Sequence, residues 1–381
     1  MPCWRARRRC CGAFSPSFDP VIRRFRIRNY RSLRDVEIAP AGLTVVTGAN
    51  GAGKSNLYRA LTLAAAAARG QLAPTLMAEG GMPSALWAGA WRQDERRRMV
   101  VEVEGSAWSY ALALGLAPHE WPAGAPPPVF ALDPVVGEEH LHGADGTLLL
   151  ERDGPGAWMR AKGAKGRTAF PPGLEPQEAA LAQVREPHLY PDLAQAQAEM
   201  ARWRFYHHFR TDAASPIRMP QVGTRTPVLS ADGGDLAAAV TTIREIGDTG
   251  SLDEAIDRAF PGARLEVEQD LGHFALFLRR RDFKRPFAAR ELSDGTLRYL
   301  CLAAALLSPR PSPLLILNEP DQSLHPDLAE PLAELIARAA EDSQLWVITH
   351  SEALARSLLR HGAAGYDLRL EGGATLAEAT A

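Results

Sequence analysis

The fold is decided by one glycine-rich run, Gly48-Ala49-Asn50-Gly51-Ala52-Gly53-Lys54-Ser55. The residues before it, 43–47, are apolar or β-branched and lead into the first glycine, which predicts a short buried strand. The residues after it, 54–68, are rich in alanine and leucine and are followed by Gly70, which predicts a helix. A strand, a glycine turn and a helix in this order are typical of a phosphate-binding loop.

The chemistry of this run suits the phosphates of a nucleotide. Glycines let the backbone turn tightly and bring its N–H groups onto phosphate oxygens, and the N-terminus of the following helix adds a positive partial charge. We expect Lys54 to reach the β- and γ-phosphates and the Ser55 hydroxyl to ligate Mg²⁺. The residues expected to bind ATP here are Asn50, Gly51, Gly53, Lys54 and Ser55.

A second run places polar groups at the end of an apolar strand. Residues 314–317 are fully apolar and lead into Asn318 and Glu319. Ligands of open α/β sheets bind at the carboxyl ends of the strands, so we expect Glu319 to be the base that polarises an attacking water. Asn318 stands where phosphate-loop ATPases usually carry an aspartate near Mg²⁺, which leaves the rate of hydrolysis open. Taken alone, the run also fits a buried strand followed by an ordinary helix cap.

Two further features lie near the C-terminal end. The run Leu292-Ser293-Asp294-Gly295-Thr296 opens an apolar helix, where a hydroxyl and free N–H groups can bind an anion. By itself this run is better explained as an ordinary N-cap. His350 follows an apolar strand predicted over 344–349 and could contact a γ-phosphate, although a lone histidine is more often structural.

With these pieces in order, the sequence resembles the ABC-type ATPases of the RecF/SMC/OLD-like branch, and most of all its short bacterial "AAA family" predicted ATPases. The matching motifs are Walker A at 48–55, the signature at 292–296, Walker B at 314–319, the D-loop at 323–327, the H-loop at 348–351 and an opening hairpin that starts at 25–33. The resemblance implies an α/β fold: a P-loop ABC-type ATPase head with a central largely parallel sheet, an antiparallel β subdomain and a helical insertion.

The resemblance also implies an ATP-dependent homodimer in which each nucleotide is shared. One subunit would supply Lys54, Ser55, Asn318, Glu319 and His350, and the other would supply Ser293 and Gly295. Relatives place further nucleotide contacts where this chain has Asn29 and Arg31.

The chain departs from the family pattern at two residues, and one family motif is not located. Asp294 replaces the usual glycine, which suggests an altered signature geometry, and Asn318 replaces the usual aspartate. The Q-loop glutamine is not placed, since Gln93 and Gln221 are both open choices.

The expected organisation has four parts. Residues 1–20 form a disordered basic extension, 21–172 form lobe I with the phosphate loop and antiparallel strands, 173–262 form a mainly helical segment, and 263–381 form lobe II. Within these parts we predict a strand at 129–132, loops at 118–128 and 153–173, helix over most of 176–209, and a helix capped by Ser251.

Composition excludes several classes of protein. The chain has 381 residues, a formal net charge of −2 and apolar runs that are too short to span a bilayer. Its four cysteines have neither zinc-site nor disulfide-framework spacing. We therefore expect a cytoplasmic protein that does not enter a membrane, and the net charge gives no global case for nucleic acid.

Local charge leaves nucleic acid open. Basic residues cluster from Arg23 to Arg34 and again from Arg279 to Arg285, and such clusters could neutralise DNA phosphates or lie on ordinary solvated strands. We expect a RecF-like ATPase switch acting on DNA or on an unidentified partner protein, in DNA repair, genome maintenance or phage defence. One alternative is a nucleotide-dependent binding module with negligible hydrolysis. Another is a transporter subunit, which is disfavoured because transporters separate the two phosphate motifs by less than half the distance found here.

Overall fold

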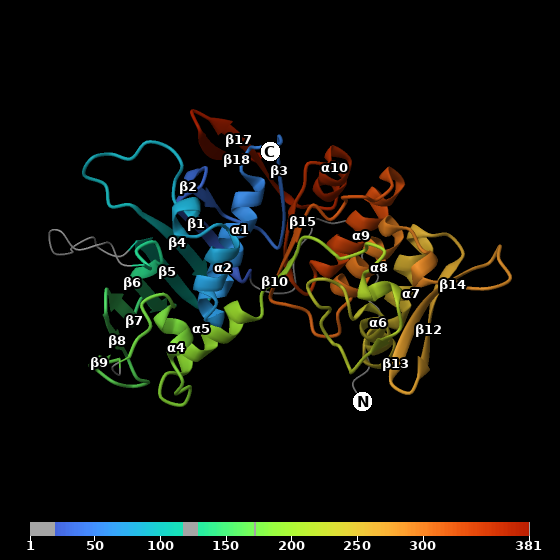
Figure 1. Cartoon of the computed structure of the whole chain (residues 1–381), viewed down its shortest axis with the longest axis horizontal. Coiled ribbons are helices and arrows are strands. Elements are labelled where there is room, and N and C mark those ends of the chain that lie inside the picture. Colours follow the sequence, from blue (N-terminus) through green and yellow to red (C-terminus); the bar gives the residue numbers. More distant parts are fainter. Residues whose placement is uncertain (1–19, 117–128, 171–172, 381) are drawn as a thin grey trace.

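The computed structural model describes residues 20–116, 129–170 and 173–380. These residues form two lobes that meet at a central sheet (Figure 1). All of the expected N-terminal extension except Pro20, and the whole loop expected at 118–128, lie outside the described residues.

The central sheet has six strands and carries the predicted phosphate loop. Its order is β10 (Arg204–Tyr206), β15 (Leu314–Asn318), β16 (Gln344–Ile348), β3 (Leu43–Gly48), β17 (Ala364–Glu371) and β18 (Ala374–Thr380). Neighbours are parallel from β10 to β17, and β18 returns antiparallel to β17. The carboxyl ends of β10, β15, β16 and β3 therefore share one edge of the sheet, where ligands of such sheets bind.

The strands of this sheet separate two hydrophobic cores. Ile316 and Ile348 pack into one core, whereas their neighbours Leu317 and Val347 pack into the other. Successive side chains of a strand point to opposite faces, so a strand between two cores must be apolar throughout. This explains why the predicted strands are continuous apolar runs rather than alternating ones.

Lobe I joins five helices to an antiparallel sheet of order β2-β1-β4-β5-β6-β7-β8-β9. The strands are β1 (Ile22–Tyr30), β2 (Leu33–Ile38), β4 (Arg98–Gly105), β5 (Trp108–Leu116), β6 (Pro134–Gly143), β7 (Leu148–Asp153), β8 (Gly156–Met159) and β9 (Thr168–Ala169). The helices are α1 (Lys54–Arg69), α2 (Leu72–Ala78), α3 (Met82–Ala85), α4 (Ala180–Gln183) and α5 (Pro191–Ala201). Helix α1 contacts both sheets and ends at Gly70, which has left-handed backbone.

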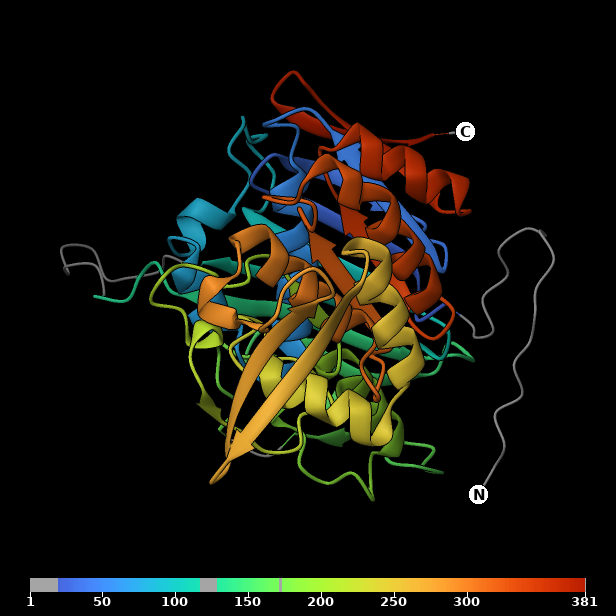
Figure 2. The same cartoon turned by 90° about the vertical axis from the view of Figure 1, so that its right-hand side faces the viewer.

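Lobe II is built around the apolar helix α8 (Asp294–Leu306), which contacts α6 (Leu236–Ile246), α7 (Thr249–Ala259) and α9 (Ala329–Ala339). Helix α10 (Glu352–Arg360) packs on α9. A small antiparallel sheet consists of β11 (Gln221–Val222), β12 (Ala263–Asp270), β13 (His273–Arg280) and β14 (Phe287–Ala288). Its β12–β13 hairpin lies across the end of the lobe (Figure 2). Short 3₁₀ helices cover Pro216–Arg218, Ala289–Glu291 and Pro326–Leu328.

The expected fold class is confirmed, with a largely parallel central sheet and an antiparallel sheet in lobe I. Helices of the segment 173–262 pack on both lobes: α5 lies on α1, and α6 and α7 lie on α8.

Several local predictions were wrong. Residues 129–132 form turns, and the strand begins later, at Pro134. The stretch 153–173, predicted as loop from its glycines and prolines, contains β8 and β9, because pairing with β7 overrides the local composition. Of the helix predicted over most of 176–209, only α4 and α5 form, and residues 204–206 instead form β10, which pairs with β15 in the central sheet. Asp248, not Ser251, caps α7.

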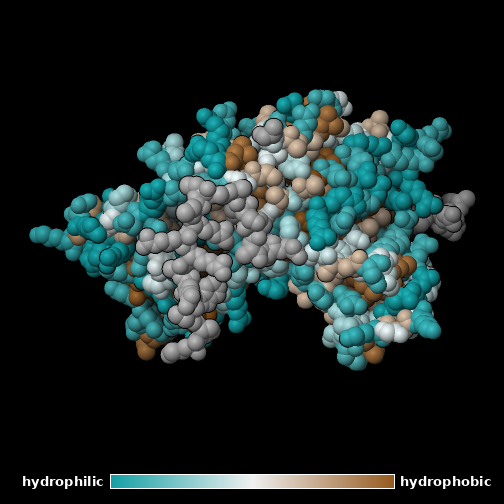
Figure 3. Space-filling view, turned by 180° about the vertical axis from the view of Figure 1, so that it is seen from behind, coloured by the Kyte–Doolittle hydropathy of each residue, from teal (hydrophilic) through white to brown (hydrophobic). Residues whose placement is uncertain are grey.

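In the part of the chain that the structure describes, no helix combines the length and the apolar character needed to cross a bilayer. The described residues on the face opposite to that of Figure 1 are mostly hydrophilic (Figure 3).

Candidate nucleotide site

The phosphate loop adopts the backbone that its glycines allow. Gly48, Gly51 and Gly53 have φ values of 148°, 83° and 105°, in the region that residues with a Cβ rarely enter. A Cβ on Gly53 would lie 2.2 Å from the Thr375 hydroxyl, and one on Gly48 would lie 2.5 Å from the Leu368 carbonyl oxygen. The loop therefore needs glycine at all three positions for its backbone, and at Gly48 and Gly53 also for its close packing.

Lys54 lies inside the loop. Its side chain is buried, and Nζ donates to the carbonyl oxygens of Gly48 at 2.7 Å and Ala49 at 3.0 Å. The loop thus curls around the ammonium group, while Asn50, Gly51 and Ser55 are exposed. This arrangement leaves Ser55 and the loop residues accessible to a ligand from solvent.

Three hydroxyl and amide side chains that no sequence motif indicated pack against the loop. Thr375 is buried and donates through Oγ1 to the Ala52 carbonyl oxygen at 2.9 Å. Ser32 hydrogen-bonds to Thr375 at 2.8 Å and accepts from Asn56 Nδ2 at 2.9 Å. Ser32 and Thr375 are 343 residues apart, so no local signal could have paired them.

Glu319 and His350 come together at the ends of neighbouring strands. The Glu319 carboxylate contacts Nδ1 of His350, and the Glu319 N–H donates to the Ile348 carbonyl oxygen at 2.7 Å. Glu319 has a φ of 51°, a left-handed conformation that is unusual for a residue other than glycine. It turns the chain sharply after β15. The predicted base and the predicted γ-phosphate contact are therefore direct neighbours.

Asn318 ends β15 with its side chain buried. Its Nδ2 donates to Nδ1 of His207 at 2.7 Å, and its Oδ1 is buried without a hydrogen-bond partner among the described residues. Partial desolvation lowers the pKa of His207, which favours its neutral form. An orphaned buried amide oxygen at the carboxyl edge of the sheet suits a cation or its bound water, so the residues present fit the expected Mg²⁺. In the described part of the chain, no group of three or more His, Cys, Asp or Glu side chains could hold a metal.

The residue beside Asn318 is a histidine, not either of the two candidate glutamines. His207 follows β10, the strand next to β15 in the central sheet. Gln93 is exposed in the loop before β4, and Gln221 lies on β11 in lobe II, where it donates to the Pro216 carbonyl oxygen at 2.8 Å. The short strand with two aromatic residues just before His207 could have indicated its position. It was not predicted because the surrounding residues have a helical composition.

The signature turn is an N-cap in the structure. Ser293 Oγ accepts from the Thr296 N–H at 3.2 Å, and α8 begins at Asp294 in ordinary helical form. A Cβ on Gly295 would lie 2.5 Å from the Ser323 carbonyl oxygen, so glycine is needed here for packing on the neighbouring D-loop. In the described residues no hydrogen bond joins Ser293 or Gly295 to the phosphate loop of the same chain.

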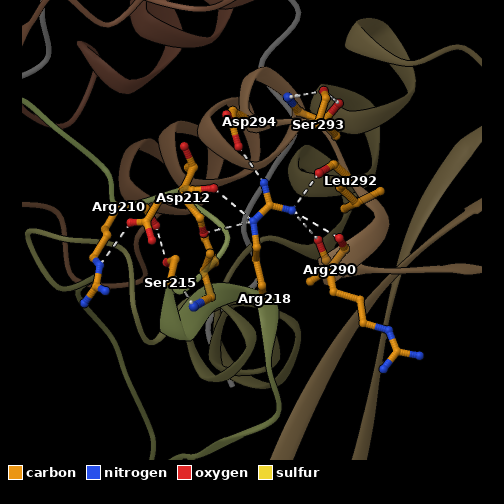
Figure 4. Close-up of polar contacts among 12 residues, drawn as sticks. Arg210, Asp212, Ser215, Arg218, Arg290, Leu292, Ser293 and Asp294 are labelled. Atoms are coloured by element: carbon orange, nitrogen blue, oxygen red, sulfur yellow. Dashed lines mark hydrogen bonds and ion pairs between the residues drawn. The ribbon is translucent and has the colours of Figure 1, made fainter.

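The aspartate at position 294, where the family usually has glycine, forms an ion pair with Arg218 (Figure 4). The Arg218 side chain is 11% exposed, and its Nη2 lies 2.5 Å from the Asp294 carboxylate. Its other nitrogens donate to carbonyl oxygens on both sides: Thr211 at 2.9 Å, Asp212 at 3.1 Å, Ala289 at 3.4 Å, Arg290 at 3.3 Å and Leu292 at 2.8 Å. Arg218 therefore fixes the backbone that leads into the signature turn.

Arg298 connects the signature helix to the sheet edge. It lies on α8 with only 4% of its surface exposed, and Nη2 donates to the carbonyl oxygens of His207 at 2.9 Å and Glu319 at 3.1 Å. The helix that begins at Ser293 thus holds together the two strand ends that carry His207 and Glu319.

Asn29 and Arg31 make contacts within lobe I. Arg31 donates to the Glu79 carbonyl oxygen at 2.9 Å and pairs with its carboxylate at 3.1 Å. Asn29 donates to the Arg98 carbonyl oxygen at 3.0 Å. Their left-handed backbones shape the turn that places Ser32 against the phosphate loop.

The basic cluster at β1 and β2 is neutralised in space. The pairs are Arg24 with Glu37 and Glu104, Arg26 with Asp35, Arg28 with Glu102, Arg31 with Glu79, and Arg34 with Glu95. In the second cluster Arg279 pairs with Glu266 and Arg285 pairs with Glu291, whereas Arg280 lies over the ring of Phe283. The local excess of positive charge is therefore smaller than the sequence indicated, above all in lobe I.

A hollow of about 620 Å³ lies beside the phosphate loop. Gly48, Ala49 and Asn50 form one wall, and His350, Arg356 and Asp367 form others. His350 of the H-loop and the phosphate loop therefore line the same cavity. Much of the rest of the lining comes from α10 and β17, and Lys54 is not part of it.

Comparisons with known proteins agree with this geometry. Residues 177–356 match a family model described as "AAA domain, putative AbiEii toxin, Type IV TA system", and residues 24–72 match one described as "AAA domain". A comparison with curated proteins found no match.

Solved structures share the fold at low sequence identity. An SmcHead bound to the C-winged helix domain of ScpA is 16% identical, with a TM-score of 0.54 over 95% of this chain and 98% of that one. An Smc head domain from Pyrococcus furiosus, with an extended coiled coil and bound to the C-terminal domain of ScpA, is also 16% identical, with a TM-score of 0.51 over 95% and 96%. The AAA-domain matches and the fold shared with SMC head domains support a P-loop ATPase of the SMC- and RecF-like type.

Proposed function

We propose that the protein is an ATP-hydrolysing switch that dimerises head to tail when it binds ATP. The observation that carries this proposal is that the residues expected to bind phosphate lie in two separate places. Lys54, Ser55, Asn318, Glu319 and His350 surround one edge of the central sheet, whereas Ser293 and Gly295 form a turn in lobe II with no hydrogen bond to the phosphate loop in the described residues. In the proposed dimer, a second copy would bring both sets to one nucleotide.

The residues at the sheet edge suit attack of water on a γ-phosphate. Bound Mg²⁺ would neutralise phosphate charge, with Ser55 and Asn318 as its protein contacts. Lys54 would exchange its two carbonyl acceptors for phosphate oxygens. Glu319 would orient and polarise the water, while His350, already in contact with that carboxylate, would hold the carboxylate in place and face the γ-phosphate.

The test of this proposal is sedimentation of the Glu319→Gln protein with and without ATP. The variant keeps a side chain of the same shape but loses the base, so we expect ATP to trap it as a dimer while the wild type returns to monomer as ATP is consumed. A Ser293→Ala, Glu319→Gln double variant should bind ATP and stay monomeric. A monomer at saturating ATP in Glu319→Gln would contradict the dimer.

A specific observation favours the second candidate, a nucleotide-dependent binding module with negligible hydrolysis: Asn318 brings no negative charge to the metal. Phosphate release separates the two candidates. The ATPase requires the wild type to release phosphate at least about tenfold faster than Glu319→Gln, in line with the contribution of a general base. Equal rates near the background would favour the binding module.

We further propose that the switch acts on DNA or on a partner protein, in genome maintenance or phage defence. Support for a protein partner is that both similar SMC heads are bound to ScpA, and support for defence is the toxin wording of the matched family model. For DNA, the cluster from Arg279 to Arg285 is the better candidate, because the cluster from Arg23 to Arg34 is largely paired with carboxylates. DNA binding that is unchanged by salt and by replacing Arg280 and Arg281 with alanine would reject the DNA proposal.

A further inference from the structure

An asparagine at a metal site must be held in one orientation, whereas an aspartate need not be. Either oxygen of a carboxylate can face a cation, whereas an amide offers an oxygen on one side and an NH₂ group on the other. Asn318 must present Oδ1 to the metal side, because an NH₂ group would repel a cation. Asn318 is only 2% exposed. Hydrogen bonds to solvent therefore cannot set the orientation of its amide group, and a neighbouring protein group must set it.

We propose that His207 is a positioning residue that orients the Asn318 amide, so that its oxygen faces the metal side of the ATP site. The register pairs Tyr206 on β10 with Leu317 on β15. The next residue of each chain segment, His207 and Asn318, therefore lies beside the other at the ends of the two strands. The Asn318 amide nitrogen lies 2.7 Å from His207 Nδ1. An amide nitrogen can only donate, so Nδ1 accepts and the imidazole proton is on Nε2.

The reversed amide is disfavoured by the same contact. With the amide turned over, Oδ1 would face the lone pair of Nδ1, and the hydrogen bond would be replaced by repulsion between two acceptors. In the observed orientation Oδ1 is buried and has no hydrogen-bond partner among the described residues, so it is left for a ligand.

His207 is itself contacted from both lobes, at its backbone from lobe II and at its ring from lobe I. Its backbone carbonyl oxygen accepts from Arg298 on the signature helix at 2.9 Å. Its ring centroid lies 5.6 Å from that of Tyr58 on α1, the helix that also carries Ser55. The two expected protein contacts of Mg²⁺, Ser55 and Asn318, are thus each next to an element that fixes His207.

This inference rests on the proposed ATP site, and a double-mutant cycle separates its failure from failure of the site. Binding of a fluorescent ATP analogue is measured against Mg²⁺ concentration in the wild type, His207→Ala, Asn318→Asp and the double variant. We expect His207→Ala to raise the Mg²⁺ midpoint about tenfold when Asn318 is present, as loss of an outer partner of a ligand typically does. In the Asn318→Asp background the same change should shift the midpoint less than about twofold, because a carboxylate needs no orientation.

Two further variants keep the cycle interpretable. His207→Gln, whose amide oxygen can accept from Asn318, should recover part of the loss. His208→Ala, at the exposed neighbouring position, should leave the midpoint unchanged. An equal loss from His207→Ala in both backgrounds, or no loss in either, would overturn the inference. Absence of analogue binding in the folded wild type would instead contradict the proposed function.

A measurement without nucleotide tests the contact itself. Nitrogen-15 spectra of the histidines in the nucleotide-free protein should show His207 with its proton on Nε2. In Asn318→Asp the proton should move to Nδ1, because a carboxylate accepts where the amide donated. His207 with its proton on Nδ1 in the wild type would also overturn the inference.

Discussion

The phosphate loop and the signature turn face the same nucleotide in the proposed dimer, but they are held in shape by different means. The phosphate loop owes its form mainly to its own glycines and to a lysine that bonds back to the loop. The signature turn depends on Arg218, which lies 76 residues before Asp294 and reaches five backbone carbonyls and one carboxylate. Most of what shapes the phosphate loop lies within its own run of residues, whereas the arginine that shapes the signature turn is distant in sequence and is found only in the folded chain.

The largest expected effect is on the phosphate loop. Lys54→Ala removes charge-assisted hydrogen bonds to phosphate, worth about 3 kcal/mol, so we expect ATP to bind about 100-fold more weakly. Titration with a fluorescent ATP analogue measures this. Arg59→Ala, at an exposed position on the same helix, is the matched control and should bind as the wild type does. Wild-type affinity in Lys54→Ala would show that this loop is not the nucleotide site.

The next effect should separate the two regions. Arg218→Ala leaves the phosphate loop intact but frees the backbone before the signature turn, so we expect ATP binding by the monomer to be retained and ATP-dependent dimerisation of Glu319→Gln to weaken at least about tenfold. The lost hydrogen bonds should also lower the free energy of unfolding by about 2 kcal/mol.

Analytical ultracentrifugation and urea unfolding measure these two quantities for Arg218→Ala. Arg225→Ala, which breaks an exposed pair with Glu245, is the control and should change neither. A dimer of unchanged strength in Arg218→Ala would mean that the signature turn holds its shape without this arginine.

Two glycine substitutions compare backbone strain with packing. Gly295→Ala places a methyl group against the Ser323 carbonyl oxygen, so we expect about 2 kcal/mol of destabilisation together with weaker dimerisation. Gly51→Ala meets open space but has a φ of 83°, so we expect about 1 kcal/mol from backbone strain alone. Thermal unfolding of both variants checks the order, and a more stable Gly295→Ala would contradict the close approach.

The smallest effect concerns acid stability near the signature turn. A hydrogen bond from Arg285 lowers the pKa of Glu291 to about 2, and the Ala288 N–H adds to it. Because the pKa is lowered by folding, this stabilisation is present above the ordinary pKa of 4.5 and is lost as the pH falls toward 2. Unfolding by urea between pH 6 and about pH 3 should therefore be less pH-dependent in Glu291→Gln than in the wild type. Equal slopes would show that Glu291 contributes nothing.

Sequence patterns predicted the core of the site because each motif is short and local. The strand–loop–helix around Lys54 and the strand ending at Glu319 follow from runs of consecutive residues, and their shared sheet edge follows from parallel pairing. The same patterns failed for β10, since a three-residue strand in a helical context has no periodicity to detect. With β10 undetected, His207 could not be placed beside Asn318.

The ion-pair partners of the basic residues could not be predicted from the sequence either. The arginines between Arg23 and Arg34 form a basic run when counted along the chain. In the sheet they alternate outward and meet carboxylates from β2, β4 and the segments that follow α2 and α3. Cross-strand partners are set by register, and register is a property of the folded sheet.

The sequence by itself determined the phosphate-loop motif at Gly48–Ser55 and the apolar α/β core, because glycine backbone freedom and side-chain hydrophobicity act within a few neighbouring residues. The tertiary structure alone decided which distant groups complete the site: Thr375 behind the loop, Arg218 at the signature turn and His207 beside Asn318. Hydrogen bonds act only over contact distance, so their partners are fixed by how the chain folds rather than by where they stand in it.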